Sequence, residues 1–219
     1  MRLTVALSKG RLLAGTEALF SRAGLGFPPQ DTRRLIVEAG DLRFLFIKDM
    51  DVPVYVEYGV ADVGVCGSDV LLEAGSDVLV PLDLGYGRCR MVVAAPPERG
   101  FGGGGQWPPA LRVATKYARV AREFFEGRGL STEIVALQGS VEIAPSLGLS
   151  DCIVDMVETG RTLRENGLVV VEEIAATSAR LVVNRASDHL NRTGIASLLD
   201  RLKAGLGVAA TLQDVDRRA

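Results

Sequence analysis

Residues 153–168, IVDMVETGRTLRENGL, join the pattern of a buried strand to a polar turn and a helix start. The apolar beginning is typical of a strand whose two faces are both covered. Gly160 allows the backbone to approach a ligand closely, and the unpaired N–H groups that open the following helix favour an anion. Thr159 and Thr162 add hydroxyl donors, whereas Arg161 either adds charge or faces solvent. The stretch therefore predicts a strand–loop–helix unit, the building block of an α/β fold, with an anion site in its loop.

Two carboxylates accompany this loop: Asp155 lies within the strand pattern, and Glu158 lies at the turn. Both would repel a phosphate, but both are good acceptors for the hydroxyls of a ribose and good ligands for Mg²⁺. A phosphate site beside two carboxylates indicates a sugar phosphate. The alternative is an ordinary helix start, in which Thr159 caps the helix and no ligand binds. The residues of the loop leave both interpretations open.

The same alternation of strand and helix patterns runs along the chain and is typical of an α/β fold with mainly parallel sheets. A change of domain is predicted at about residues 88–90, with a return at about 176–180. Strands are predicted at 2–7, 33–39, 42–48, 61–66, 77–82, 89–95, 111–115, 133–137, 152–157, 168–174 and 179–184, with a hairpin turn at Gly40-Asp41. Helices are predicted from 10 to near 24, from 51, from 68, where Ser68 would be the cap, and at about 118–128, 140–147, 160–166 and 193–204.

The composition restricts the classes of function. The 219-residue chain has 47% hydrophobic and 24% charged residues, as a globular protein with a sizeable core does. Its net charge of −2 provides no basic field for nucleic acid, and no run approaches the roughly 18 apolar residues of a membrane span. The apolar N-terminal run is interrupted by Lys9 and Arg11, so we expect no signal peptide. Three separated cysteines then indicate reduced thiols in the cytoplasm, and a single histidine argues against a zinc site or a histidine-based triad.

A second candidate anion site is the SKGRL motif at residues 8–12, which also follows a predicted strand and opens a helix. Lys9, Gly10 and Arg11 place two cations and free backbone donors at one turn. The motif is not a Walker A loop, because Thr16 stands where that loop needs lysine. The alternative is a solvated pair of surface charges.

A third set of cations lies at the two ends of the predicted hairpin. Arg33 and Arg34 begin one strand and Lys48 ends the other, so antiparallel pairing would bring them close together. Only one of the two neighbouring arginines can face a given cleft, because alternate strand residues point to opposite faces. The alternative is a charged sheet edge that prevents aggregation.

Two further segments receive structural interpretations. In GSVEIAP, residues 139–145, Ser140 would cap a helix, and Glu142 would favour its first turn. Residues 96–110 contain four consecutive glycines, and we interpret them as a flexible surface loop. The glycine-rich part at 100–106 matches no motif that indicates a function.

Taken together, these motifs resemble one family, the short-form ATP phosphoribosyltransferases that open histidine biosynthesis. Eight segments occur in the expected order across almost the whole chain: SKGRL (8–12), DTRRL (31–35), DVPVYVEYGVADVG (51–64), DLGYGRCRMVVAAP (83–96), RVATKY (112–117), GSVEIAPSLGLSD (139–151), DMVETGRTL (155–163) and ARLVVNRAS (179–187).

The resemblance implies two α/β domains like those of type II periplasmic binding proteins, with the active site in the cleft between them. Domain I would comprise residues 1–88 plus 178–219, and domain II residues 89–177. The family activity moves phosphoribosyl from phosphoribosyl pyrophosphate to N1 of ATP, with Mg²⁺ and release of pyrophosphate. A non-catalytic protein of the same fold that binds a small anion is the alternative.

The resemblance also implies roles for individual residues. Lys9, Arg33 and Lys48 would be catalytic, and Mg²⁺ would be held mainly by the substrate rather than by protein ligands. The phosphoribosyl pyrophosphate site would comprise Asp155, Glu158, Thr159, Gly160, Arg161 and Thr162. Pyrophosphate or the ATP phosphates would bind Lys9, Gly10, Arg11 and Arg33.

Family members commonly carry arginine at the position of Lys48, and lysine keeps the charge but loses the bidentate fork. Cys66 and Ser68 replace the threonine and the basic residue that are usual there, and we expect Cys66 to be buried and inert. The long-form relatives have a regulatory C-terminal domain. Its absence here implies a separate regulatory subunit resembling histidyl-tRNA synthetase, and a homodimer within a hetero-octamer.

Overall fold

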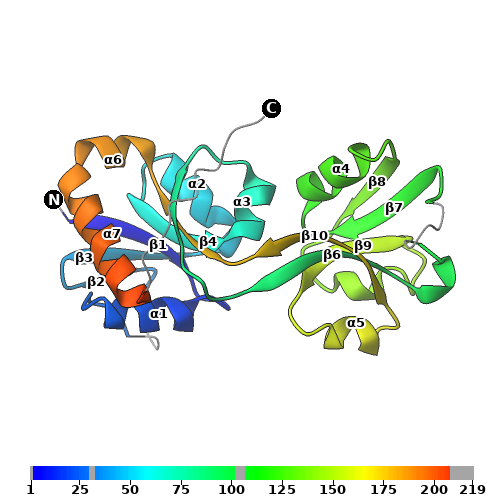
Figure 1. The fold of residues 1–219 in the computed structure, drawn as a ribbon, viewed down its shortest axis with the longest axis horizontal. Helices are drawn as coiled ribbons and strands as arrows, with labels where there is room; N and C mark the ends of the chain where they lie inside the picture. The colour runs from blue at the N-terminus through cyan, green and yellow to red at the C-terminus, as the bar shows by residue number, and fades with distance from the viewer. Residues whose placement is uncertain (1, 30–32, 102–106, 208–219) are drawn as a thin grey trace. The chain divides into compact units, whose positions relative to one another are not determined.

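The structure, a computed structural model, describes residues 2–29, 33–101 and 107–207. The chain forms two compact units: unit 1 comprises Met1–Gly87 and Ser178–Ala219, and unit 2 comprises Arg88–Thr177. The first crossing lies one residue before the boundary expected at 88/89, and the second coincides with the one expected at 177/178. Each unit has its own sheet and its own hydrophobic cores (Figure 1).

Unit 1 contains a six-stranded sheet in the order β2-β3-β1-β4-β11-β5. Its strands are β1 (Leu3–Ser8), β2 (Ile36–Ala39), β3 (Leu42–Ile47), β4 (Val63–Gly67), β5 (Leu79–Asp83) and β11 (Ala179–Val183). Its helices are α1 (Leu13–Arg22), the 3-10 turn η1 (Asp49–Asp51), α2 (Val52–Glu57), α3 (Ser68–Ala74), α6 (Arg185–Leu190) and α7 (Arg192–Leu206).

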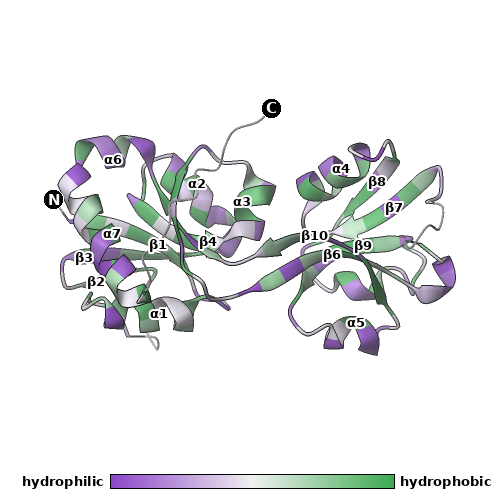
Figure 2. Cartoon of the chain, viewed as in Figure 1, coloured by the Kyte–Doolittle hydropathy of each residue, from purple (hydrophilic) through white to green (hydrophobic). Residues whose placement is uncertain are grey.

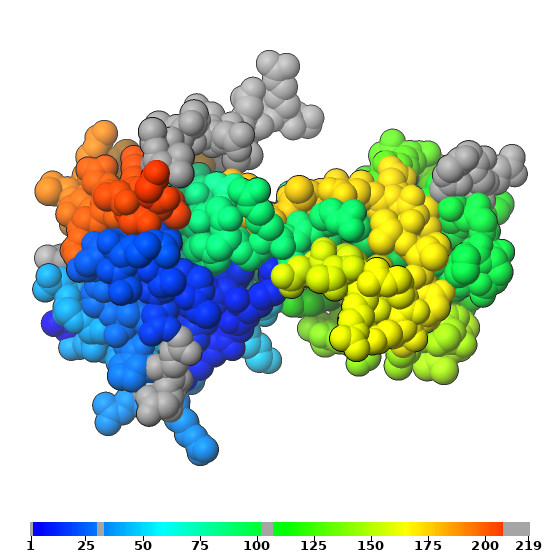
Figure 3. Space-filling view, turned by 60° about the horizontal axis from the view of Figure 1, so that its bottom comes forward, coloured from blue at the N-terminus to red at the C-terminus, as the bar shows by residue number. Residues whose placement is uncertain are grey.

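Both faces of the unit 1 sheet are covered, as the apolar strands predict. Along β1, Val5 and Leu7 belong to one core and Ala6 to the other, because successive strand residues point to opposite faces. Helices α1 and α7, far apart in sequence, pack together on the first face (Figure 3). On the second face α2 contacts β4 closely, since a Cβ at Gly64 would lie 2.8 Å from Cγ1 of Val52.

Unit 2 contains a five-stranded sheet in the order β10-β6-β9-β7-β8. Its strands are β6 (Cys89–Ala95), β7 (Ala110–Thr115), β8 (Ser131–Ala136), β9 (Cys152–Val157) and β10 (Val169–Thr177). Its helices are the 3-10 turn η2 (Pro97–Arg99), α4 (Ala118–Glu126), the 3-10 turn η3 (Val141–Ile143) and α5 (Arg161–Glu165). Apolar residues concentrate along the central strands in each unit (Figure 2).

The sheets are mixed, whereas the sequence predicted mainly parallel ones. Among the residues that the structure describes, parallel pairing is confined to β3-β1-β4 and to β9-β7-β8. Strand β2 is antiparallel to β3 because the predicted turn at Gly40-Asp41, which the structure confirms, permits only a hairpin. Strands β6, β10 and β11 lie next to the crossings and also pair antiparallel.

Several local predictions were wrong. Strand β2 begins at Ile36, so Arg33 and Arg34 precede the strand instead of starting it. Ser68 is the first residue of α3 and accepts a hydrogen bond from the Ser178 N–H, so it is not the cap. The helix expected at 140–147 is only the short turn η3.

Ser140, expected as a helix cap, makes no side-chain capping bond. Helix α6 was not predicted. Of the glycine-rich segment 100–106, residues 102–106 lie outside the described residues, as do residues 31 and 32 of the DTRRL motif. Within the described ranges, no helix has both the length and the apolar character that crossing a membrane requires.

Candidate active site

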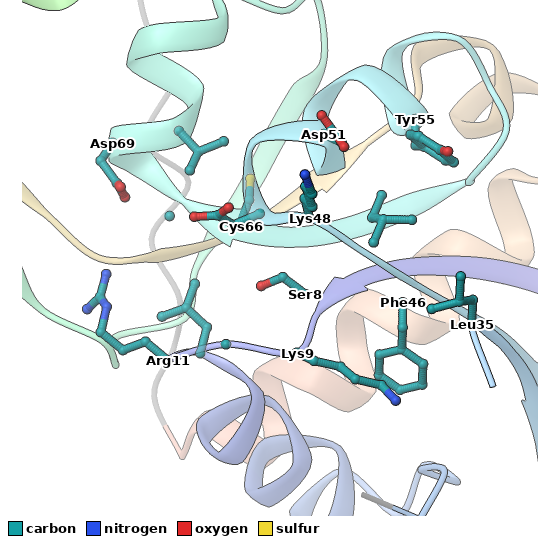
Figure 4. A pocket seen from close by; sticks show the side chains of 16 residues that line it. Ser8, Lys9, Arg11, Leu35, Phe46, Lys48, Asp51, Tyr55, Cys66 and Asp69 are labelled. Carbon is teal, nitrogen blue, oxygen red and sulfur yellow. The ribbon is translucent and has the colours of Figure 1, made fainter. Parts of the chain in front are cut away.

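In unit 1, the carboxyl ends of the parallel strands β1, β3 and β4 meet at one edge of the sheet. The chain leaves these ends through the SKGRL motif, through the turn that contains Lys48, and through Gly67. Such an edge is where open α/β sheets bind ligands. A cavity of about 700 Å³ lies here (Figure 4). Its lining includes Ser8, Lys9, Gly10, Arg11, Phe46, Lys48, Asp49, Asp51, Tyr55, Cys66 and Asp69.

Lys9 is held against an aromatic ring in this cavity. Its Nζ lies 4.9 Å from the centroid of the Phe46 ring, and the side chain extends along that ring (Figure 4). Phe46 is 4% exposed, so the ring is a fixed platform. A cation over an aromatic face is attracted by the ring quadrupole. The ring therefore helps to hold the ammonium of Lys9, which lines the cavity.

Arg11 lines the cavity and also contacts the end of Met1–Gly87, the first of the two chain segments that make up unit 1. Its Nη1 donates a hydrogen bond to the carbonyl oxygen of Gly87 at 2.7 Å. Gly87 has φ +62°, and a Cβ there would lie 2.3 Å from Cδ2 of Leu12, so glycine is required. The guanidinium has further N–H groups, so Arg11 can serve this backbone contact and an anion together.

Lys48 also lines the cavity, together with Asp49 and Asp51 on the turn that follows it. Arg33 is exposed and does not contribute to the cavity lining, whereas Leu35, two residues later, does. The structure thus brings Lys9, Gly10, Arg11 and Lys48 together and leaves Arg33 outside the lining.

Cys66 is buried, as expected, with 2% of its surface exposed. Burial, and secondarily the Asp69 carboxylate, raises the pKa of the thiol well above its usual range. A thiol that stays protonated is neither a nucleophile nor a metal ligand. Cys66 therefore contributes shape to the cavity rather than reactivity.

In unit 2, the carboxyl ends of the parallel strands β7, β8 and β9 also meet at one edge. Asp155, near the end of β9, faces Glu142 of η3 and Lys116 after β7. Burial raises the pKa of Asp155 from 3.8 to about 6; its hydrogen bond from the Met156 N–H lowers it, Glu142 raises it and Lys116 lowers it. Two carboxylates and an ammonium thus share one edge, which suits a ligand rich in hydroxyls.

The loop after β9 is the one that the sequence assigned to an anion. Gly160 has φ +72° and ψ +12°, and it is itself the N-cap of α5, which has no side-chain cap. The alternative prediction was that Thr159 caps the helix. The contact of that kind that the structure shows is a long one, in which the Arg161 N–H donates to Oγ1 of Thr159 at 3.4 Å. Glu158 and Thr162 are exposed, and Arg161 pairs with Glu165 at 2.7 Å on the exposed side of α5.

The family model described as ATP phosphoribosyltransferase matches residues 48–204. The chain belongs to this family. The ATP phosphoribosyltransferase of Acidithiobacillus ferrooxidans is 50% identical over 207 residues, which are 92% of this chain and 96% of that protein. The enzyme of the same name from Sorangium cellulosum is 48% identical over 92% of this chain and 95% of its own length.

Solved structures agree with this family membership. The ATP phosphoribosyl transferase (HisG:HisZ) complex from Thermotoga maritima matches with a TM-score of 0.83 and 36% identity, over 94% of this chain and 98% of that one. The alkanesulfonate-binding protein SsuA from Xanthomonas axonopodis pv. citri matches with a TM-score of 0.55 and 12% identity, over 93% of this chain and 72% of that one. The second likeness confirms the fold expected for the family, that of a periplasmic-type binding protein.

For a member of the ATP phosphoribosyltransferase family, sequence reasoning missed three residues at these two edges. Glu142 and Lys116 were not assigned to the site, although each follows the carboxyl end of a parallel strand of the unit 2 sheet. Phe46, near the carboxyl end of β3, was not assigned to the site either, and its ring supports Lys9. The signal that could have found all three is their place at or after the carboxyl ends of predicted strands.

Proposed function

We propose that the chain transfers phosphoribosyl from phosphoribosyl pyrophosphate to N1 of the adenine of ATP, the first step of histidine biosynthesis. The observation that carries this proposal is the family membership at 50% identity over nearly the full length of a named relative. The unit 2 edge supports it, because Asp155, whose pKa Glu142 influences, precedes a loop whose backbone turns at Gly160. No finding favours the non-catalytic alternative.

The phosphoribosyl group is assigned to unit 2. The backbone amides of residues 159–162 and the hydroxyls of Thr159 and Thr162 would bind its 5′-phosphate. The carboxylate of Asp155, with Glu142 or Glu158, would accept hydrogen bonds from the ribose hydroxyls. Asp155 accepts best when ionised, so its raised pKa places this role above about pH 6.

Pyrophosphate or the phosphates of ATP are assigned to the unit 1 cavity. The adenine N1 lone pair forms the new bond to the anomeric carbon, while the bond to pyrophosphate breaks and its electron pair leaves with the pyrophosphate oxygen. The adenine then relieves its positive charge by releasing a proton from the exocyclic amino group to solvent. Lys9, Arg11 and Lys48 would stabilise the negative charge that develops on the leaving pyrophosphate. Stabilisation of charge that develops in the transition state is usually the largest single contribution to catalysis.

The chemistry of the donors is consistent with Mg²⁺ as the metal. Among the residues that the structure describes, no group of three or more His, Cys, Asp or Glu side chains could hold a metal ion. Mg²⁺ does not need such a group, because it binds through substrate phosphates, waters and one or two carboxylates. Mg²⁺ would therefore be held mainly by the substrate, where it would supply positive charge to the pyrophosphate.

We further propose that the chain acts in the cytoplasm as a homodimer within a hetero-octamer with a regulatory subunit. The Thermotoga maritima relative was solved as a HisG:HisZ complex, which supports such a partner. All three cysteines, Cys66, Cys89 and Cys152, are buried and free, which suits a reducing compartment.

A direct assay tests the activity. Purified protein is mixed with ATP, phosphoribosyl pyrophosphate and Mg²⁺ in the presence of a pyrophosphatase, and the ultraviolet absorbance of the N1-ribosylated adenine is followed. The double change Thr159→Val and Gly160→Val should weaken phosphoribosyl pyrophosphate binding sharply and leave ATP binding nearly intact.

The matched control is Gly167→Val. Gly167 also has positive φ, at +71°, but a Cβ there meets nothing within 4 Å. It therefore carries the same backbone strain outside the loop. No absorbance change with the wild type would refute the activity, and equal loss of both substrates in the double variant would refute the loop assignment.

A further inference from the structure

Helix α5 carries two arginines that behave differently. Arg161 reaches along the helix to Glu165, and its side chain is 79% exposed. Arg164 turns back instead, and its Nη1 donates a hydrogen bond to the carbonyl oxygen of Thr159 at 3.2 Å. A Cβ built on Gly160 would lie 3.3 Å from the same nitrogen, so the guanidinium lies directly against the loop. The loop and α5 form part of the surface of unit 2 (Figure 3).

This hydrogen bond fixes the orientation of one peptide group. In a trans peptide the C=O and the N–H point in opposite directions. Because the Thr159 carbonyl points to Arg164, the Gly160 N–H points away from it. Gly160 is left-handed and Arg161 is helical, and this pair of conformations makes consecutive N–H groups converge on one concave side.

The other orientation of the same peptide would oppose phosphate binding. A glycine allows the preceding peptide to turn over at low cost, because it tolerates both signs of φ. After such a turn the Thr159 oxygen would point to the concave side and repel a phosphate. The contact with Arg164 favours the orientation that leaves N–H groups there.

We propose that Arg164 is a positioning residue for the phosphate loop, which it holds in the orientation that binds the 5′-phosphate. This role rests on the proposed function of residues 158–162. Arg164 is exposed, so its charge is screened by solvent and its main effect comes from the hydrogen bond.

The test compares Arg164→Met, which keeps the apolar stem and removes the donor, with Arg164→Lys, which keeps a donor and the charge. We expect Arg164→Met to raise KM for phosphoribosyl pyrophosphate roughly five- to tenfold, as a hydrogen bond from an exposed charged donor predicts. KM for ATP and kcat should change by less than about twofold. ATP does not bind the loop in this proposal, and turnover of the bound complex does not depend on the orientation of the loop peptide. Arg164→Lys should recover most of the loss.

Arg119→Met is the matched control. Arg119 pairs with Glu123 on α4 of the same unit at 2.7 Å, and it is far from residues 158–162 along the sequence. It should leave both KM values unchanged. Binding of ribose 5-phosphate, titrated calorimetrically without ATP, measures the loop independently of turnover.

An unchanged KM for phosphoribosyl pyrophosphate in Arg164→Met, or an equal rise in both KM values, would overturn the role of Arg164. If the wild type binds ribose 5-phosphate but does not turn over, the proposed activity fails and the titration still decides the role of Arg164. If the wild type binds no ribose 5-phosphate, the role of Arg164 fails with the loop assignment.

Discussion

The substitution Asp155→Asn should stabilise the ligand-free protein at high pH while it impairs substrate binding. Burial raises the pKa of the Asp155 carboxyl from 3.8 to about 6. The native state therefore holds this proton more tightly than the unfolded chain between these two values. Stability falls as pH rises through that window, and the full cost of a buried charge is present above it.

The cost follows from the size of the shift. A pKa that rises by about two pH units, at about 1.4 kcal/mol for each, corresponds to ~3 kcal/mol of lost stability at pH 8. At pH 4.5 the native carboxyl is protonated and the unfolded one partly so, and the cost is only ~1 kcal/mol. Relative to the wild type, Asp155→Asn should thus gain roughly 2 kcal/mol in free energy of unfolding between pH 4.5 and pH 8.

Urea unfolding at both pH values measures this difference. The control is Asp200→Asn, because the side chain of Asp200 is 78% exposed and pairs with Lys203 only at 3.9 Å. It should show little dependence on pH. Meanwhile kcat/KM for phosphoribosyl pyrophosphate should fall at least tenfold in Asp155→Asn, as loss of a charged hydrogen-bond acceptor predicts. A stability difference that is the same at both pH values would refute the buried-charge interpretation.

Three other predictions follow from the unit 1 geometry and from the proposed partner. Lys48→Ala should lower kcat at least tenfold if the ammonium stabilises the leaving group, and Lys48→Arg should retain activity; unchanged turnover in Lys48→Ala would remove the residue from the site. Gly15→Ala should destabilise the protein by about 1–3 kcal/mol in urea unfolding, because its Cβ would lie 2.5 Å from the Tyr86 ring, whereas a Cβ at Gly139 meets nothing within 4 Å and Gly139→Ala should change stability little. The chain assayed alone should be insensitive to histidine, and clear inhibition without a partner would contradict a separate regulatory subunit.

Much of the fold could be predicted from apolar patterns, because strands with two covered faces leave a strong signal. Strand β9 and the hairpin turn at Gly40-Asp41 are examples, and both are where the sequence placed them. The direction of pairing could not be predicted at the crossings. Nothing local in the sequence of β6 distinguishes a buried antiparallel strand from a parallel one, since both are continuous apolar runs.

The site was predictable where the loop chemistry is local and was missed where it depends on the sheet. Lys9 and Gly160 belong to strand–loop–helix motifs that the sequence shows directly. From the sequence, Glu142 had the pattern of a carboxylate at a helix start. The ends of β8 and β9 converge only in the tertiary structure, so the sequence did not place Glu142 at the site. Ser140 precedes it with φ +51°, the only positive φ of a non-glycine residue in the described part of the chain, and no pattern announces such a conformation.

The assignment of the phosphoribosyl group to residues 155–162 is tested most directly by a crystal structure of the protein soaked with phosphoribosyl pyrophosphate. We predict density for the 5′-phosphate within hydrogen-bond distance of the backbone N–H groups at Gly160 and Arg161, and for the ribose hydroxyls beside Asp155. Ordered substrate density elsewhere, with this loop empty, would contradict that assignment.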